Sequence, residues 1–176
     1  MKVILSLNNP LWKTPERRRI LDKAVRQSAA ELESLIKRKI LDSSPAGKVY
    51  RRGAIFKSGA AADRKLNRTR FKRKFFSLFD EKFAVAFEFH RASAPGQPPA
   101  VSTGGLLNSI RARALGELKA QVATAQKYAA ALDQGAKIKN ARIAARPFFA
   151  STAEEFRARF KQNLIDAIKQ VGVKAQ

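Results

Sequence analysis

Residues 14–44 read TPERRRILDKAVRQSAAELESLIKRKILDSS and predict a single long helix. Thr14 suits the N-cap, Pro15 fits the first turn, and Glu16 complements the positive end of the helix dipole. Apolar residues recur at helical spacing on one face, namely Leu21, Val25, Ala29, Leu32, Leu35, Ile36 and Ile40. At 1.5 Å per residue this helix is about 40 Å long. The rest of the chain must therefore supply an apolar surface that covers one side of it.

A small antiparallel sheet is the predicted partner of this helix. Lys2–Leu7 is interpreted as a first strand. Residues 109–115 and 117–124, joined at Gly116, have the pattern of a β-hairpin. The sheet thus combines one strand that precedes the long helix with two that follow it.

The C-terminal region predicts a second long helix over residues 146–172. Ser151 and Glu154 have the spacing of a capping box, and Gly172 is expected to end the helix. Its predicted buried stripe consists of Phe156, Phe160, Leu164, Ile168 and Val171.

Shorter elements connect these parts. Thr103 is expected to cap a short turn or helix that follows it. Residues 126–136 predict a short helix closed by Gly135, and residues 137–145 predict a basic loop or arm.

The middle of the chain predicts two paired strands, over 48–57 and 82–90. Apolar side chains alternate at Phe83, Val85, Phe87 and Phe89. Phenylalanines also recur every four residues from position 71, which predicts a helix over 68–80. The resulting fold class is α+β, with a small antiparallel sheet flanked by a long N-terminal helix and a C-terminal helix, and with an inserted basic arm. We expect a single domain over residues 1–176.

The chain carries 36 Lys and Arg against 14 Asp and Glu, a formal net charge of +22. Such a field attracts polyanions and repels other copies of the chain. We therefore expect nucleic acid, an acidic protein surface, or both, as partners. The sequence has no cysteine, which excludes disulfides and thiolate chemistry. No apolar run approaches the roughly 20 residues of a membrane span, and no secretory signal is recognisable, so we expect no membrane partner and synthesis in the cytoplasm.

The densest positive charge lies in the middle of the chain. Its members are Arg51, Arg52, Arg64, Lys65, Arg68, Arg70, Lys72, Arg73 and Lys74. One interpretation is a solvated surface loop. The other is contact with phosphates or with acidic rings of a partner, and phosphate contacts of this kind read no base sequence.

Residues suited to catalysis or metal binding are few. His90 is the only histidine, and the sequence contains no HExxH, P-loop, GxSxG or GxGxxG motif. In the acidic pairs Asp80-Glu81 and Glu154-Glu155, the two side chains are expected to point apart. We expect no catalytic residue, no metal and no cofactor, and the chain is not expected to be an enzyme.

Four short segments follow the basic stretch in order: APGQPP at 94–99, TGGLLNSI at 103–110, YAAALDQG at 128–135 and RPF at 146–148. This set resembles the tail-completion or neck proteins of long-tailed bacteriophages, the small head–tail joining family. The resemblance marks twelve of these positions as candidate subunit interfaces, and they are Pro95, Gly96, Pro98, Pro99, Thr103, Gly104, Ser109, Ile110, Tyr128, Arg146, Pro147 and Phe148. The other positions that match the family pattern are Ala94, Leu106 or Leu107, Ala129, Leu132, Asp133 and Gly135. Relative to the family, residues 53–90 look like a basic insertion, and Leu132–Ala136 departs from the family's Glu-Phe-Gly-Thr.

The resemblance implies a structural virion protein that joins head and tail as part of an oligomeric ring around the DNA channel. The implied partners are its own copies in a ring of six, adjacent neck proteins, an adaptor or the tail terminator or tube, and the packaged DNA. The implied location is the head–tail interface of the virion, after assembly in the host cytoplasm. Pro95–Pro99 would be a stiff, extended strap with free carbonyls for a neighbouring subunit, or alternatively a plain connector.

A second interpretation rests on charge alone. A sequence-independent nucleic-acid-binding protein accounts equally well for the isoelectric point of about 11.2. It does not account for the four ordered segments.

Overall fold

The computed structural model describes residues 1–7, 14–57, 72–78, 81–138 and 141–173. The chain divides into two compact units. The main unit combines Met1–Pro45 with Ser93–Gln176, and the strand unit is Ala46–Ala92. The strand unit contains the whole of the predicted insertion over 53–90. Among the described residues, no helix is both long enough and apolar enough to cross a membrane.

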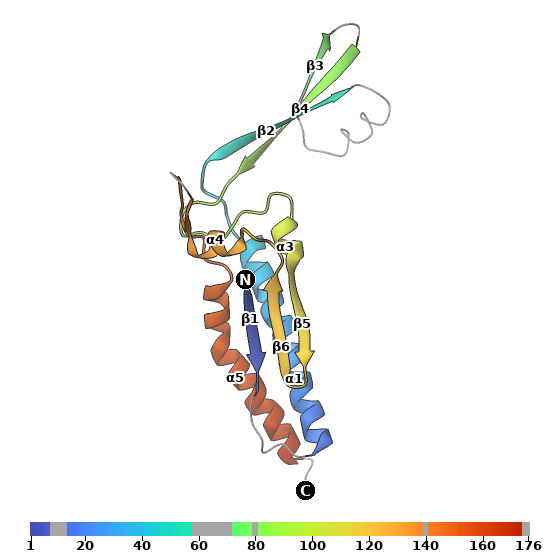
Figure 1. The fold of residues 1–176 in the computed structure, drawn as a ribbon, viewed down its shortest axis with the longest axis vertical. Coiled ribbons are helices and arrows are strands. Elements are labelled where there is room, and N and C mark those ends of the chain that lie inside the picture. The colour runs from blue at the N-terminus through green and yellow to red at the C-terminus, as the bar shows by residue number, and fades with distance from the viewer. Residues whose placement is uncertain (8–13, 58–71, 79–80, 139–140, 174–176) are drawn as a thin grey trace. The chain divides into compact units, whose positions relative to one another are not determined.

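The main unit is an α+β structure built on a three-stranded antiparallel sheet. Its strands are β1 (Lys2–Ser6), β6 (Lys119–Thr124) and β5 (Ile110–Gly116), in the order β1-β6-β5. Two long helices, α1 (Pro15–Leu41) and α5 (Ala150–Val173), flank this sheet (Figure 1). These elements confirm the predicted fold class, the first strand, the hairpin around Gly116 and both long helices.

Short elements lie between and after the strands. Helices α3 (Gly105–Ser109) and α4 (Ala129–Gln134) are both present, and Gly135 closes α4 with a φ of 78°. Residues 137–145 were predicted as a basic loop or arm, and the loop alternative is wrong, because β7 (Ala136–Ile138) pairs with β8 (Ala141–Ile143). Isoleucine in both segments favours the extended conformation of a ribbon.

The core of the main unit forms where α1 lies against one face of the sheet. The helix contributes Val25, Ala29, Leu32, Ile36 and Ile40, each at most 2% exposed. They form one cluster with Leu5, Ile110, Ala120 and Val122 of the strands. A valine, leucine or isoleucine side chain in this cluster stabilises the fold by about 1.5 to 3 kcal/mol when it is fully buried. The apolar stripe that predicted the helix is therefore also the surface that binds the sheet.

Helix α5 completes this core with Phe156, which is buried, and with Phe160 and Leu164, which are partly buried. The predicted stripe is wrong further along, because Ala167 is buried and Ile168 is exposed. Residues spaced by four drift around a helix with 3.6 residues per turn. A spacing of three, from Leu164 to Ala167, therefore returns to the buried face. Gly172 does not end the helix, which continues to Val173.

Two carboxylates of α1 hold the β5–β6 hairpin. A Glu33 oxygen accepts the backbone N–H of Ala112 on β5 at 2.6 Å, and an Asp22 oxygen accepts that of Leu118 in the turn at 3.0 Å. Glu33 also forms an ion pair with Lys37. Burial alone would raise the pKa of Glu33, but the bonds from Lys37 and Ala112, with the charges of Lys37 and Arg111, together hold it below its ordinary value.

The strand unit is a second antiparallel sheet, in the order β2-β4-β3. Strand β2 (Val49–Lys57) pairs with β4 (Glu81–Arg91), which confirms the predicted pairing of 48–57 with 82–90. The predicted helix over 68–80 is wrong, because Lys72–Leu78 forms β3. Strand β4 has two edges with backbone groups to satisfy, and β3 hydrogen-bonds to the edge that β2 leaves open.

Leu32→Ala tests whether the α1 face carries the stability of the main unit. Leu32 is fully buried, so we expect a loss of about 2 to 5 kcal/mol in the free energy of unfolding, measured by urea denaturation. Leu41→Ala, in the same helix at 58% exposure, is the matched control and should change stability little. Equal losses in both variants would contradict this placement of the core.

Glu33→Gln tests the clamp between α1 and β5. Because the folded pKa lies below the unfolded value of about 4.3, the carboxylate stabilises the fold above that pH and loses this effect as the pH falls through the folded pKa. We expect Glu33→Gln to lower stability at pH 7 and to flatten its decline between about pH 5 and pH 3. Glu16→Gln, at an exposed position of α1, should keep the wild-type slope. A wild-type slope in Glu33→Gln would contradict the clamp.

Candidate functional site

Two of the segments that carry the phage resemblance meet at the carboxylate of Asp133, which is only 4% exposed on α4. One oxygen accepts the backbone N–H groups of Phe148 at 2.8 Å and Phe149 at 2.7 Å, and the other accepts that of Ala150 at 3.2 Å. These N–H groups open helix α5, so the negative charge also sits at the positive end of its dipole. Asp133 thereby joins the 128–135 segment to the 146–148 segment.

The predicted capping box is wrong for this reason. Ser151 lies inside α5 and accepts a bond from Lys39, while Glu154 forms an ion pair with Arg157. The carboxylate that caps the helix comes instead from a different helix. The prediction that Glu154 and Glu155 point apart is confirmed, because Glu155 pairs with Lys39 and not with Arg157.

Arg146 joins the same end of α5 to the strap. Its guanidinium donates to the carbonyl oxygen of Ser93 from Nε at 3.4 Å and from Nη2 at 3.3 Å. Its backbone N–H donates to the carbonyl of Leu132 at 2.7 Å. The sequence indicated Arg146 but not Ser93, because a backbone acceptor leaves no signal in the residue type.

The strap itself begins with a tight turn. The Gln97 N–H donates to the Ala94 carbonyl at 3.2 Å, and Gly96 has a φ of 79°, which suits a type II turn with Pro95 before it. The Gly96 N–H donates to the carbonyl of Ala145 at 2.9 Å. The strap is therefore fixed to the chain segment that leads into α5.

Two expectations for Pro95–Pro99 are corrected by this geometry. The segment is not extended throughout, because glycine after proline permits the turn at its start. Its carbonyls are not all free, since Ser43 donates to the carbonyl of Pro99 at 3.4 Å. Pro99 is also buried, so this end of the strap belongs to the interior of the main unit.

The 103–110 segment forms α3 and leads directly into β5. Gly104, with a φ of 75°, occupies the N-cap that was predicted for Thr103. The Thr103 hydroxyl accepts only the Gly105 N–H, at 3.5 Å. Ser109 lies 2.7 Å from the hydroxyl of Thr124, and Ile110 is fully buried, so these two candidates anchor the segment in the sheet.

Hydrogen bonds join segments 93–110, 128–135 and 144–150 into a unit that we call the platform. Two surfaces at the platform face outward. A groove of about 160 Å³ is lined by residues 99–104, which include the end of the strap, by α3 and by Tyr128. Val101 and Tyr128 are 41% and 47% exposed, so apolar surface is accessible at the groove.

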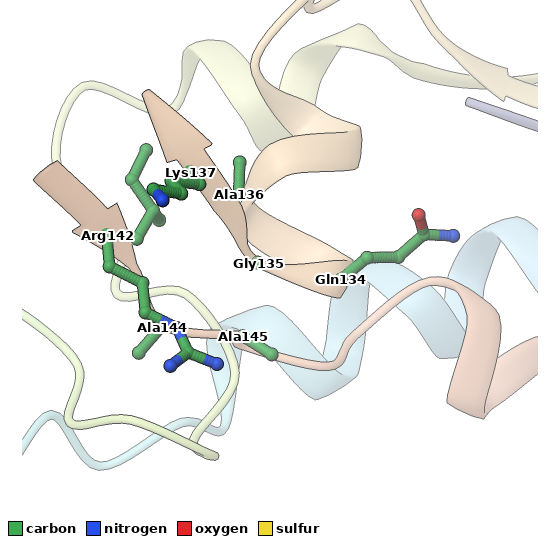
Figure 2. Close-up of a pocket in the computed structure, with 8 residues that line it drawn as sticks. Gln134, Gly135, Ala136, Lys137, Arg142, Ala144 and Ala145 are labelled. Atoms are coloured by element: carbon green, nitrogen blue, oxygen red, sulfur yellow. The ribbon is translucent and has the colours of Figure 1, made fainter. Parts of the chain in front are cut away.

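The second surface is a larger hollow of about 690 Å³ at the β7–β8 ribbon. Figure 2 shows Lys137 and Arg142 among the side chains that line it, and these two residues lie directly opposite each other in the ribbon. Like charges in this position repel, which favours an anion between them. Gly135 is required here, because a Cβ atom would lie 2.9 Å from the carbonyl oxygen of Ile143.

The residues of the predicted basic arm are placed only in part. Arg51 and Arg52 lie on β2, and Lys72, Arg73 and Lys74 lie on β3. Arg64, Lys65, Arg68 and Arg70 lie outside the described residues. The ladder brings Arg52 opposite Glu88 and Lys72 opposite Phe87, on the two sides of β4.

Metal-binding groups of side chains are absent from the part of the chain that the structure describes. No three His, Cys, Asp or Glu side chains are grouped there so that they could hold a metal ion. His90 lies on β4 opposite Tyr50 and is partly buried.

Comparison with family models, with curated proteins and with solved structures found no match to this chain.

Asp133→Ala tests the centre of the platform. Three N–H groups would lose their acceptor, two of them on fully buried phenylalanines, so we expect a loss of at least about 2 kcal/mol in unfolding free energy. Asp133→Asn, which keeps one carbonyl oxygen, should lose less. The control is Asp42→Ala, at an exposed carboxylate beyond the C-terminus of α1. Equal stability of Asp133→Ala and Asp42→Ala in thermal denaturation would contradict the role of Asp133.

Proposed function

We propose that this chain is a structural subunit of a bacteriophage neck, which joins head and tail as part of a ring around the DNA channel and catalyses no reaction. One observation carries the proposal. Three of the four segments that resemble the neck family are separated in sequence but are held together through Asp133, Arg146 and Gly96, and the fourth, 103–110, lines one groove with Pro99 and Tyr128. A shared structural role is the simplest reason for such segments to occur together in one chain.

The platform has the physical properties that a ring contact needs. Closure of a ring requires two different surfaces on each subunit, one for each neighbour. The groove beside Val101 and Tyr128 offers an apolar surface, and the β7–β8 ribbon, which connects two segments of the platform, offers a positively charged one. Because hydrogen bonds already hold the strap, a neighbour binds it with little further loss of conformational entropy.

The charge of the chain supports a position among polyanions. Six copies would carry six times the net charge of +22, and such a ring repels itself unless acidic protein surfaces or DNA neutralise it. The cations on β2 and β3 are part of this charge.

A second function is favoured by the same charge. A sequence-independent nucleic-acid-binding protein would use the strand unit to contact phosphates. It gives no reason for the platform, which is why we rank it second.

Neutralising the basic arm separates the two functions. The variant replaces Arg68, Arg70, Lys72, Arg73 and Lys74 by Gln in the genome that encodes the chain. A neck subunit predicts filled heads and complete tails that fail to join, counted by electron microscopy. A nucleic-acid-binding protein predicts joined particles and a loss of duplex binding by the purified variant.

The matched control removes the same charge from the helices of the main unit. It replaces Arg17, Arg19, Lys23, Arg38 and Lys161 by Gln, and it should leave particles joined. Circular dichroism of both purified variants excludes unfolding as the cause. Joined particles in the arm variant, or unjoined particles in the control, would overturn the proposed role of the arm. Joined particles after deletion of the whole gene would overturn the neck function itself.

A further inference from the structure

The sheet of the main unit has a second face, which lies away from α1 and its core. Side chains alternate between the faces of a strand, so residues opposite each other in the ladder share a face. Buried Leu5, Val122 and Ile110 mark the core face. The register sets Lys2, Ala123 and Arg111 in one row of the other face, and Ile4, Gln121 and Arg113 in the next.

A third row of this outer face contains Ser6 and Lys119. Its four cations, Lys2, Arg111, Arg113 and Lys119, are all exposed. Figure 1 shows this sheet with α1 behind it. We call these rows the open face; its positions on β1 and β5 and Lys119 are exposed, and Gln121 and Ala123 in the middle of β6 are partly exposed.

Charge is distributed very differently between the helices and this sheet. Helices α1 and α5 contain 12 Lys and Arg and 7 Asp and Glu, and ion pairs such as Arg159–Glu31 and Lys39–Glu155 join them. The strands β1, β5 and β6 contain 4 Lys and Arg and no Asp or Glu. The helices keep a net charge of +5, but most of their cations lie beside a carboxylate, whereas the strands supply no carboxylate for the cations of the open face.

Nearby carboxylates do not change this conclusion. Glu33 reaches the edge of β5 but already bonds Lys37 and the Ala112 N–H, and it also feels the charge of Arg111. Glu117 lies in the turn after β5 and pairs with Arg18 at 3.9 Å. Lys2, Arg113 and Lys119 are left as the cations best placed to bind an external anion.

We propose that the open face binds the phosphate backbone of double-stranded DNA. Neighbouring strands lie about 4.8 Å apart and alternate residues about 6.7 Å apart along a strand, so the cations are spread over the surface and do not converge on one point. Cations distributed over a surface in this way can each contact a different phosphate of the DNA backbone, and such contacts need no pocket.

An acidic protein is the less suitable ligand for this surface. The centre of a stable protein interface is usually apolar. In the paired rows of the open face, Ile4 is the one large apolar residue, at 42% exposure. The remaining paired positions are cationic, small or polar. This inference does not depend on the neck function, since it concerns the ligand of one surface of the main unit.

Chemical footprinting of the wild-type chain tests the inference independently of the basic arm. Lysines are acetylated with and without a 30-base-pair duplex at low salt, and the modification is located by mass spectrometry. We expect the duplex to protect Lys2 and Lys119 from acetylation. Lys23 and Lys161, which are exposed on the helices, should stay reactive. Unprotected Lys2 and Lys119, or equal protection of all four lysines, would overturn the proposal.

Salt dependence gives a second measurement. The sheet variant replaces Lys2, Arg113 and Lys119 by Gln, and the helix variant replaces Arg19, Lys23 and Lys161 by Gln. Each phosphate contact contributes about 0.9 to the slope of log binding constant against log salt, so the sheet variant should lose up to about 2.7 and the helix variant close to none. Equal slopes would overturn the proposal. Protection of Lys2 and Lys119 by poly-L-glutamate but not by DNA would assign the face to an acidic protein instead.

Discussion

The carboxylate of Asp133 is the interaction on which the platform depends. Phe148 and Phe149 are both fully buried, and their rings meet edge to face with centroids 6.1 Å apart. Water cannot reach their N–H groups there, so a buried acceptor must satisfy them. Asp133 does so. Because it fixes the start of α5, it also fixes Arg146, which lies two residues before Phe148. Arg146 holds the carbonyl of Ser93, and the adjoining Ala145 holds Gly96 of the strap. A single charged group in the interior thus sets the position of three chain segments.

The same use of carboxylates explains how a chain of such high charge remains compact. It has only 14 acidic residues, and three of them, Asp22, Glu33 and Asp133, bind backbone N–H groups of the main unit. Others pair with cations on α1 and α5. Acidic residues therefore hold elements together, while the strands of the open face contain cations and no acidic residue. Stability and attraction for polyanions arise in different parts of the fold.

The sequence was sufficient for those features that depend on local periodicity. The stripe on α1, the hairpin around Gly116 and the pairing of β2 with β4 all follow from spacing and turn residues. It failed where a distant group overrides a local signal: Asp133 replaces the capping box at Ser151, and the free edge of β4 turns Lys72–Leu78 into a strand. The platform was only partly predictable, because its acceptors at Ser93 and Ala145 are backbone carbonyls. The alternation of Arg111 and Arg113 in the sequence indicates that both lie on one face of β5. That Lys119 and Lys2 share this face follows only from the register of the three strands.

A rigid platform and a separate positively charged sheet together describe a subunit that larger assemblies hold in place, which is the basis of the proposed neck role. The central claim is that the segments around Asp133 form one rigid structure. Native-state hydrogen exchange of the amides of Phe148, Phe149 and Ala150 tests it most directly. The account predicts that these three amides exchange only through global unfolding, with the same free energy as the amides of Leu32 and Ile36 in the core. Exchange through local opening, at the rate of an exposed loop, would contradict it.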